Sequence, residues 1–318
     1  MFVTDAVHKD GFHIIILKDM AAGTSAEIIP SCGGILHAFK VLHHNNSINV
    51  IDHYDSKDDF EQHVATKGFK SCKLSPFACR IKNATYQFDG TTYHIKKKLL
   101  GANAIHGLIY DASFSILQQY ANEDNATLVL QYAYQEADPG YPFSFDCIIT
   151  YQLTHNNELI ITTEIINRDK KPIPVQDGWH PYFTLGKKID DLELSFQSKK
   201  QVDFDEQLIP SGKLVEYSEF VTAKKIKNTF LDNSFTLNFN TDQPLCILKD
   251  PDNKIQVEIR PDKSYPYLQI YTPPHRQSIA IENLSAPPDA FNNGINLIIL
   301  SPQEYAIFTT SYKVTTLK

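Results

Sequence analysis

The sequence has little of what marks several large protein classes. Its 318 residues include one tryptophan, two methionines, thirteen glycines and seventeen prolines, which excludes a collagen-like chain. No apolar run approaches the length of a transmembrane helix. The apolar run Ile14–Leu17 near the N-terminus is too short, and too close to charged residues, to be typical of a signal peptide. We therefore expect a cytoplasmic protein that does not bind membranes.

Motifs for metals and cofactors are also missing. The five cysteines form no close CxxC pair, and Cys72 and Cys79 lack the paired Cys/His motif that would complete a zinc site. GxGxxG, the Walker loop, GxSxG and HExxH are absent. We therefore expect reduced thiols, no metal and no cofactor.

The composition that is present is globular. Hydrophobic residues make up 42% and charged residues 21% of the chain. Thirty basic and thirty-seven acidic residues give a net charge of −7, which disfavours a nucleic-acid partner. Sixteen tyrosines and nineteen phenylalanines favour β-structure.

The hydrophobic pattern has the two-residue period of β-strands. Thr127–Gln135 and Phe143–Leu153 alternate in this way, and a polar Asn-containing turn separates the second run from Leu159–Ile166. Similar hairpins are predicted at 86–95 and 245–259, and further strands at 12–17, 35–41, 235–239, 267–271, 279–281 and 295–300. The pattern predicts an all-β protein, a large antiparallel β-sandwich. Hairpins follow one another without a linker, so we expect a single domain over residues 1–318.

Helices are predicted to be rare. Asp58–Thr66 is the one candidate, with Asp58 or Asp59 as its N-cap and Phe60 and Val64 on its apolar side. Strands do not alternate with long amphipathic helices, which disfavours a doubly wound sheet or an α/β barrel.

Three polar residues stand in apolar or turn-rich surroundings. His106 precedes Gly107, and a structural turn histidine is the alternative interpretation. His180 lies in an aromatic segment that suits a sugar pocket but also an aromatic core. Glu282 ends an apolar strand, where a structural ion pair with Arg80 or Arg276 is the alternative.

Together these segments resemble the aldose 1-epimerase (galactose mutarotase) family. The resemblance rests, in the family's order, on Ala78–Ile81, Asn103–Gly107, Gly178–Phe183, Phe230–Asp232 and Ile281–Phe291. The HPYF segment, followed about a hundred residues later by EN-x-x-x-PPDAF, is the most specific part. Leu108 and Pro181 depart from the commonest family pattern, in which glycine and threonine occupy these positions.

The resemblance implies a galactose mutarotase-like supersandwich and an isomerase that needs neither metal nor cofactor. It implies that Glu282 is the catalytic base and His180 the catalytic acid. It also implies that His106 positions the sugar and helps to polarise the ring oxygen, and that Arg80 and Asp232 bind sugar hydroxyls.

The implied chemistry is the interconversion of α and β anomers through ring opening. A base takes the proton of the C1 hydroxyl while an acid protonates the ring oxygen, and the open aldehyde then rotates and recloses. At ordinary pKa values the glutamate is ionised and the histidine readily protonated near neutrality. We expect Glu282 and His180 to face one cleft about a sugar ring apart, with Trp179 or Tyr182 stacked on the sugar.

The expected substrate is a free hexose such as glucose or galactose. The alternatives are a hexose-6-phosphate 1-epimerase, which needs a cationic cluster beside the cleft, and a non-catalytic carbohydrate-binding protein. A polysaccharide-active enzyme on the same fold is a third alternative. We expect a monomer or a homodimer.

Overall fold

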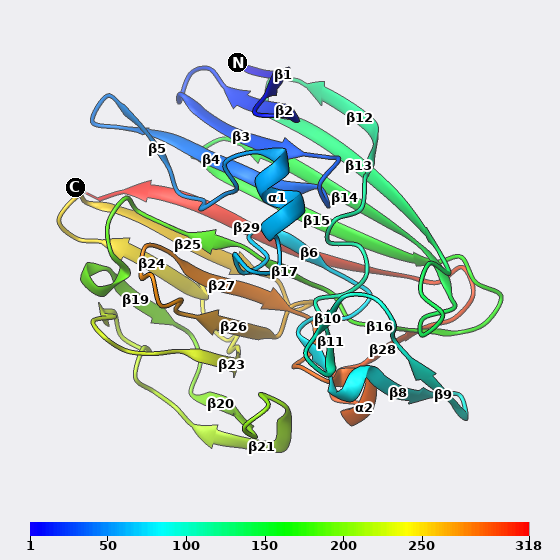
Figure 1. Cartoon of the computed structure of the whole chain (residues 1–318). Helices are drawn as coiled ribbons and strands as arrows, with labels where there is room; N and C mark the ends of the chain where they lie inside the picture. Colours follow the sequence, from blue (N-terminus) through cyan, green and yellow to red (C-terminus); the bar gives the residue numbers. More distant parts are fainter. Residues whose placement is uncertain (318) are drawn as a thin grey trace.

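The computed structural model describes residues 1–317, and nearly all regular structure in them is β-strand (Figure 1). Almost all strand pairs are antiparallel; the isolated bridge between Ser75 and Gly107 is parallel. The structure therefore confirms the predicted all-β class.

The N-terminal sheet has the order β1-β2-β3-β4-β5. Its strands are β1 (Phe2–Lys9), β2 (Phe12–Asp19), β3 (Thr24–Ile29), β4 (Ile35–His43) and β5 (Asn46–Asn49).

The nine-stranded sheet has the order β12-β13-β14-β15-β29-β25-β24-β19-β22. Its strands are β12 (Ser115–Ala121), β13 (Asn125–Gln135), β14 (Ser144–Thr154), β15 (Glu158–Asn167), β19 (Glu193–Phe196), β22 (Lys224–Lys225), β24 (Cys246–Asp250), β25 (Ile255–Pro261) and β29 (Tyr305–Thr316). Two hairpins predicted from the sequence, β14–β15 and β24–β25, lie in this sheet.

The eight-stranded sheet carries most of the candidate site residues. Its order is β21-β20-β23-β26-β27-β17-β6, with β18 also paired to β27. Its strands are β6 (Cys72–Leu74), β17 (Gly178–His180), β18 (Tyr182–Phe183), β20 (Lys200–Phe204), β21 (Pro210–Glu216), β23 (Asp232–Thr236), β26 (Tyr267–Tyr271) and β27 (Ile279–Leu284).

Small sheets and short helices complete the fold. The strands are β7 (Arg80–Ile81), β8 (Thr85–Phe88), β9 (Thr91–His94), β10 (Leu99–Leu100), β11 (Asn103–Ile105), β16 (Ile173–Val175) and β28 (Ile298–Leu300). The helices are α1 (Lys57–His63), α2 (Ala290–Asn293) and the 3₁₀ turns η1 (Lys82–Ala84) and η2 (Ile189–Asp191). None of the helices in residues 1–317 is long and apolar enough to cross a membrane.

Three local predictions need correction. The N-cap of α1 is Ser56, whose hydroxyl accepts a hydrogen bond from the Asp59 amide at 3.1 Å, rather than either aspartate. Strand β23 covers 232–236 and not 235–239, and β28 covers only the end of 295–300. Helix α2 was not predicted, because four residues are too few to show a helical period.

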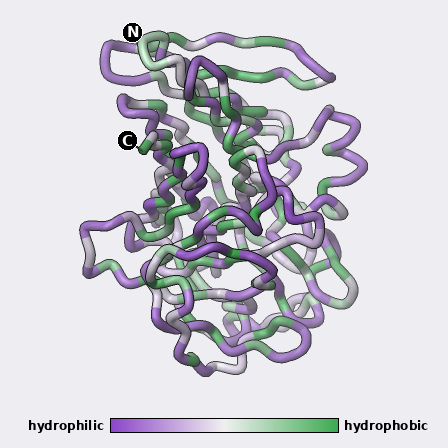
Figure 2. The backbone as a smooth tube through the Cα atoms, turned by 90° about the vertical axis from the view of Figure 1, so that its left-hand side faces the viewer, coloured by the Kyte–Doolittle hydropathy of each residue, from purple (hydrophilic) through white to green (hydrophobic). Residues whose placement is uncertain are grey.

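The main core lies where the large sheets face each other. It contains the inward side chains of alternate strand residues, among them Ile149 and Ile161 of the nine-stranded sheet and Leu268 and Ile281 of the eight-stranded sheet. Hydrophobic and hydrophilic residues accordingly follow one another closely along the chain (Figure 2). Because side chains alternate across a strand, the residues between these core positions on β26 and β27 face away from the core.

Candidate active site

A pocket of about 210 Å³ lies against the face of the eight-stranded sheet that points away from the main core. All five residues predicted from the sequence line it: Arg80, His106, His180, Asp232 and Glu282. The other lining residues are Ala65, Gly68, Phe69, Cys79, Leu100, Ile105, Tyr182, Gln269 and Tyr271.

His180 and Glu282 are closer together than predicted. Strands β17 and β27 pair with Trp179 opposite Asn283, so the next position places His180 opposite Glu282 on the same face. The His180 Nε2 atom lies 3.4 Å from the Glu282 Oε1 atom. The expected separation of about a sugar ring is therefore wrong, because the pairing of these two strands could not be seen in the sequence.

Only one of the two proposed stacking residues lies in the pocket. Trp179 alternates with His180 along β17, so its indole points into the main core, where Nε1 lies 3.3 Å from the Thr163 hydroxyl. Tyr182 does line the pocket, and its ring stacks on that of His180 with centroids 5.3 Å apart.

A strained turn presents His106. The residue follows β11 with a φ of 59°, and its amide donates a 2.9 Å hydrogen bond to the Cys79 carbonyl. The next residue must be glycine: a Cβ at Gly107 would lie 2.2 Å from the Ser75 carbonyl oxygen. The turn brings the His106 ring edge-on to that of His180, with centroids 4.9 Å apart. Strain at a buried polar residue is typical of functional positions.

Burial changes the protonation that the sequence led us to expect. Desolvation lowers the pKa of His180 to about 4. Desolvation, and then the nearby Asp232 carboxylate, raise the pKa of Glu282 well above its ordinary value. The pair therefore favours a carboxylic acid and a neutral imidazole, not the predicted carboxylate and imidazolium. In either arrangement the Glu282–His180 pair shares one ionisable proton.

The remaining polar residues surround this pair. Burial, followed by the proximity of His180 and Arg80, lowers the pKa of His106 well below its ordinary value, so its ring is neutral. Burial raises the pKa of Asp232, while the Arg80 charge and the hydrogen bond from Gln269 oppose the shift. The Gln269 Nε2 atom donates that bond to Asp232 Oδ1 at 2.9 Å.

Several polar atoms of the pocket have no protein partner. Within residues 1–317, Glu282 Oε2, His180 Nδ1 and His106 Nδ1 are buried and accept or donate no hydrogen bond. Leaving a buried polar group unpaired costs about 1–3 kcal/mol. Three such atoms in one cluster are therefore unusual in a structural role and indicate a site for a polar ligand.

The structural alternative for Glu282 finds limited support. Arg276 instead pairs with Asp190, with Nε 2.6 Å from Oδ1. The Arg80 charge acts on Glu282 and lowers its pKa, but this effect is smaller than that of desolvation. Glu282 is thus a buried carboxyl, 2% exposed, whose contact in the pocket is His180.

A buried ion pair lies behind the pocket. Lys73 of β6 donates to the Asp177 carboxylate and, at 3.1 Å, to the Gly178 carbonyl. Its ammonium also lies 4.6 Å from the centre of the Trp179 ring. The Tyr265 hydroxyl donates a 2.7 Å hydrogen bond to the same carboxylate. These contacts hold the backbone at the start of β17, two residues before His180.

Phe69, Gln269 and Tyr271 are among the lining residues that were not predicted from the sequence. Gln269 and Tyr271 alternate with the core residues Leu268 and Ile270 on β26. The polar Gln269 inside this otherwise apolar strand was therefore a usable signal of a site. Phe69 lies in a loop, where the sequence offered no comparable signal. No group of three or more His, Cys, Asp or Glu side chains able to hold a metal ion occurs in residues 1–317.

Solved structures define the class of fold. A galactose mutarotase-like protein from Clostridium acetobutylicum matches 100% of this chain and 99% of its own, with a TM-score of 0.87 and 17% identity. The protein is therefore a galactose mutarotase-like β-sandwich, as predicted.

The sequence comparisons define the family. The chain belongs to the aldose 1-epimerase family, whose sequence model matches residues 15–313, and is thus an isomerase of carbohydrates. It is similar to the uncharacterized protein YihR of Escherichia coli (strain K12), at 29% identity over 75% of this chain and 77% of that protein. It is also similar to a maltose epimerase of Levilactobacillus brevis, at 24% identity over 76% and 75% of the two chains.

Proposed function

We propose that this protein interconverts the α and β anomers of a free aldohexose, such as glucose or galactose, by acid/base ring opening between Glu282 and His180. The observation that carries the proposal is the contact of these two side chains, 3.4 Å apart and both buried, in a pocket where Glu282 Oε2 has no partner within residues 1–317.

The short distance suits this reaction better than the separation we had expected. The two oxygens that exchange protons, O1 and the ring oxygen, are bonded to the same carbon. Neighbouring acid and base groups can therefore reach both. The proton on the Glu282–His180 pair passes to His180, which leaves a carboxylate and an imidazolium without exchange with solvent.

Every proton and electron pair is accounted for in the ring-opening step. Glu282 takes the O1 proton, the electrons of that O–H bond form the aldehyde carbonyl, and the bond between C1 and the ring oxygen breaks. His180 gives its proton to the ring oxygen. After rotation about the C1–C2 bond the steps reverse, and the pair again holds one proton. His106, neutral, would hydrogen-bond the sugar, and Arg80 and Asp232 would bind hydroxyls.

A hexose 6-phosphate is the second candidate, because two lysines adjoin the pocket. Lys67 and Lys70 line the space beyond Gly68 and Tyr182. Each is already neutralised, however: Lys70 Nζ lies 2.7 Å from Asp52, and Lys67 Nζ lies 2.7 Å from Asp59. This pairing favours an uncharged sugar. A cytoplasmic location and a monomeric or dimeric state stay predictions.

Polarimetry tests the proposal. Freshly dissolved α-D-glucose and α-D-galactose should reach equilibrium rotation faster with the protein than in buffer alone, and EDTA should not slow this. Equal rates with and without protein would reject aldose epimerisation. A rate enhancement for 6-phosphates alone would favour the second candidate.

A further inference from the structure

A short segment forms one wall of the candidate active site. Residues 64–71 connect α1 to β6, and three of them, Ala65, Gly68 and Phe69, line the pocket. The segment fits closely against the rest of the site, because a Cβ at Gly68 would collide with the Tyr182 hydroxyl. Its conformation therefore decides the shape of this wall.

The Phe69 ring packs against both histidines of the pocket. Its centroid lies 4.6 Å from that of His106, in an edge-on arrangement, and 6.4 Å from that of His180. It also meets the Tyr110 ring edge-on at 5.3 Å. Phe69 is 5% exposed, so one apolar ring takes the place of water beside both imidazoles.

Packing has to orient these two imidazoles. In many active sites a hydrogen bond to the second ring nitrogen holds a histidine in place. Within residues 1–317, the Nδ1 atoms of His106 and His180 have no hydrogen-bond partner. The direction of each ring therefore depends on the side chains packed against it, and Phe69 touches both.

The backbone holds Phe69 in a conformation that phenylalanine rarely adopts. Its φ is 55°, and that of Ser71 is 56°. A left-handed conformation of a bulky residue persists only where neighbouring groups hold it, and such positions concentrate at functional sites. The Phe69 amide donates a 2.8 Å hydrogen bond to the Val64 carbonyl, and the Ser71 amide donates one of 2.9 Å to the His180 carbonyl. The segment is thus bonded directly to β17.

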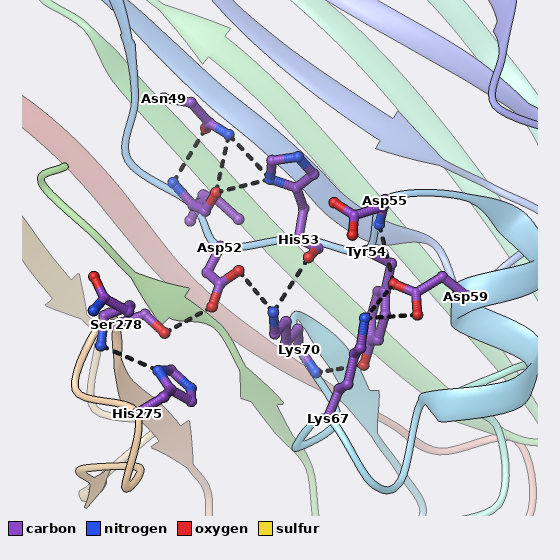
Figure 3. Close-up of polar contacts among 12 residues, drawn as sticks. Asn49, Asp52, His53, Tyr54, Asp55, Asp59, Lys67, Lys70, His275 and Ser278 are labelled. Carbon is purple, nitrogen blue, oxygen red and sulfur yellow. Dashed lines mark hydrogen bonds and ion pairs between the residues drawn. The ribbon is translucent and has the colours of Figure 1, made fainter.

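Lys70 connects the same segment to a second strand of the site (Figure 3). Its amide donates a 2.8 Å hydrogen bond to the Tyr54 hydroxyl, and its ammonium lies 2.7 Å from the Asp52 carboxylate. Asp52 also accepts a 2.7 Å hydrogen bond from the Ser278 hydroxyl, and Ser278 directly precedes β27. The side chains of Lys70, Asp52 and Ser278 therefore form a tether between the segment and β27.

We propose that Phe69 is a positioning residue, which the tether holds against His106 and His180 so that the two rings keep their directions and water stays out of this side of the pocket. The proposal rests on the proposed function. Phe69 itself transfers no proton. Lys70 acts through the tether, and its ammonium serves Asp52 and not the sugar.

The first test removes the ring. Phe69→Ala frees both imidazoles to turn, so we expect kcat for glucose to fall roughly 10- to 100-fold, with KM changed less than about threefold. Water admitted beside His180 stabilises its charged form. The acid limb of kcat/KM should therefore move upward from a pH of about 4 by about one pH unit or more. Phe69→Leu, which keeps the apolar bulk, should lie between Phe69→Ala and the unchanged protein.

The other groups around His180 stay the same in these variants. The titratable side chains facing it are Glu282 of β27, His106 after β11, Tyr182 of β18 and Cys72 of β6. The charged residues Arg80 and Asp232 line the same pocket, and the segment itself carries Lys67 and Lys70, each paired with an aspartate. A shift of the acid limb in Phe69→Ala therefore reports the solvation of the histidines.

The second test keeps Phe69 and loosens the tether. Lys70→Met removes the cation from Asp52 and should lower kcat roughly 3- to 10-fold, with the acid limb moved in the same direction. Lys70→Arg keeps the ion pair and should restore most of the activity. The matched control is Lys57→Met, which breaks an exposed ion pair with Glu61 on α1. It should change neither kcat nor the acid limb.

Phe196→Ala is the control for the loss of a buried ring. Phe196 of β19 is 1% exposed and does not line the pocket, so its removal should lower stability without moving the acid limb. Normal kcat and a normal acid limb in folded Phe69→Ala would overturn the proposal. A rise in KM alone would do the same, since it would make Phe69 a sugar contact.

Two further outcomes are distinguishable. If Phe69→Ala does not fold, Phe69→Leu and Lys70→Met decide by the same readouts, and unchanged kinetics in both would reject the positioning role. If the unchanged protein accelerates the interconversion of anomers for no aldose, the proposed function fails, and the role of Phe69 fails with it.

Discussion

Glu282 is the residue on which the proposed chemistry depends most directly. Glu282→Gln keeps the shape and most hydrogen-bonding capacity but removes the base. We expect kcat to fall about 10²-fold or more with little change in KM, the usual effect of losing a general base. Initial rates by polarimetry, corrected for the spontaneous reaction, measure it. A folded variant with near-normal kcat would make the carboxyl structural.

Arg80 should act on binding. Arg80 lines the pocket, and a charge-assisted hydrogen bond from it to a sugar hydroxyl would form in both the ground and transition states. We expect Arg80→Ala to raise KM about tenfold or more with a smaller effect on kcat. Lys82→Ala, a nearby exposed residue, is the control and should change neither constant. A loss confined to kcat would argue against a binding role.

The pKa shifts predict an unusual pH profile. Activity needs one proton on the Glu282–His180 pair. Below the His180 pKa of about 4 both groups are protonated and no base remains, so kcat/KM should fall there and not near 6.5. The alkaline limb reports loss of the last proton from Glu282, whose pKa is raised. A pH series of kcat/KM would contradict this assignment if its acid limb lay near 6.5.

The sequence predicted which residues lie together better than how they are spaced, and their roles stay predictions. Arg80, His106, His180, Asp232 and Glu282 stand in short recognisable segments, and all line one pocket. Their spacing and protonation depend on strand register and burial, which are long-range properties. For this reason the contact between His180 and Glu282, and the direction of their pKa shifts, were not predicted.

At the level of elements, β17 shows why a strand suits this site. Its alternation places Trp179 in the main core and His180 in the pocket, so packing of one residue fixes the other. The strand β27 repeats the arrangement: Asn283 accepts a 2.8 Å hydrogen bond from Thr310 on one side, and Glu282 faces the pocket on the other. The alternation of β27 was predictable from the sequence, whereas strand β17 and its pairing with β27 were not.

Lys73 should be important for the stability of this part of the sheet. Lys73→Met would leave the Asp177 carboxylate buried without its cation, and removing one partner of a buried pair costs about 3–5 kcal/mol. Urea unfolding measures the loss. Lys18→Met, which breaks an exposed pair with Asp5, should cost much less. Equal losses in the two variants would show that the buried pair has no special role.

For the whole molecule, the structure leads us to expect cooperative unfolding. One hydrophobic core includes residues from the N-terminal, nine-stranded and eight-stranded sheets. The fluorescence of Trp179, which packs in that core, and far-UV circular dichroism should therefore change in a single coincident transition with denaturant. Two separate transitions would contradict the prediction of one domain over residues 1–318.

The position of β29 has a consequence for how the protein is made. This strand follows β1–β28 in the sequence, yet it lies inside the nine-stranded sheet, between β15 and β25 (Figure 1). During synthesis, β15 and β25 therefore each lack the neighbour β29 on one edge until residues 305–316 have left the ribosome. Open edges invite pairing with other chains. The nascent chain is thus prone to aggregation until β29 has been made, and chaperone protection is most valuable during this stage. The stage ends when β29 pairs with β15 and β25.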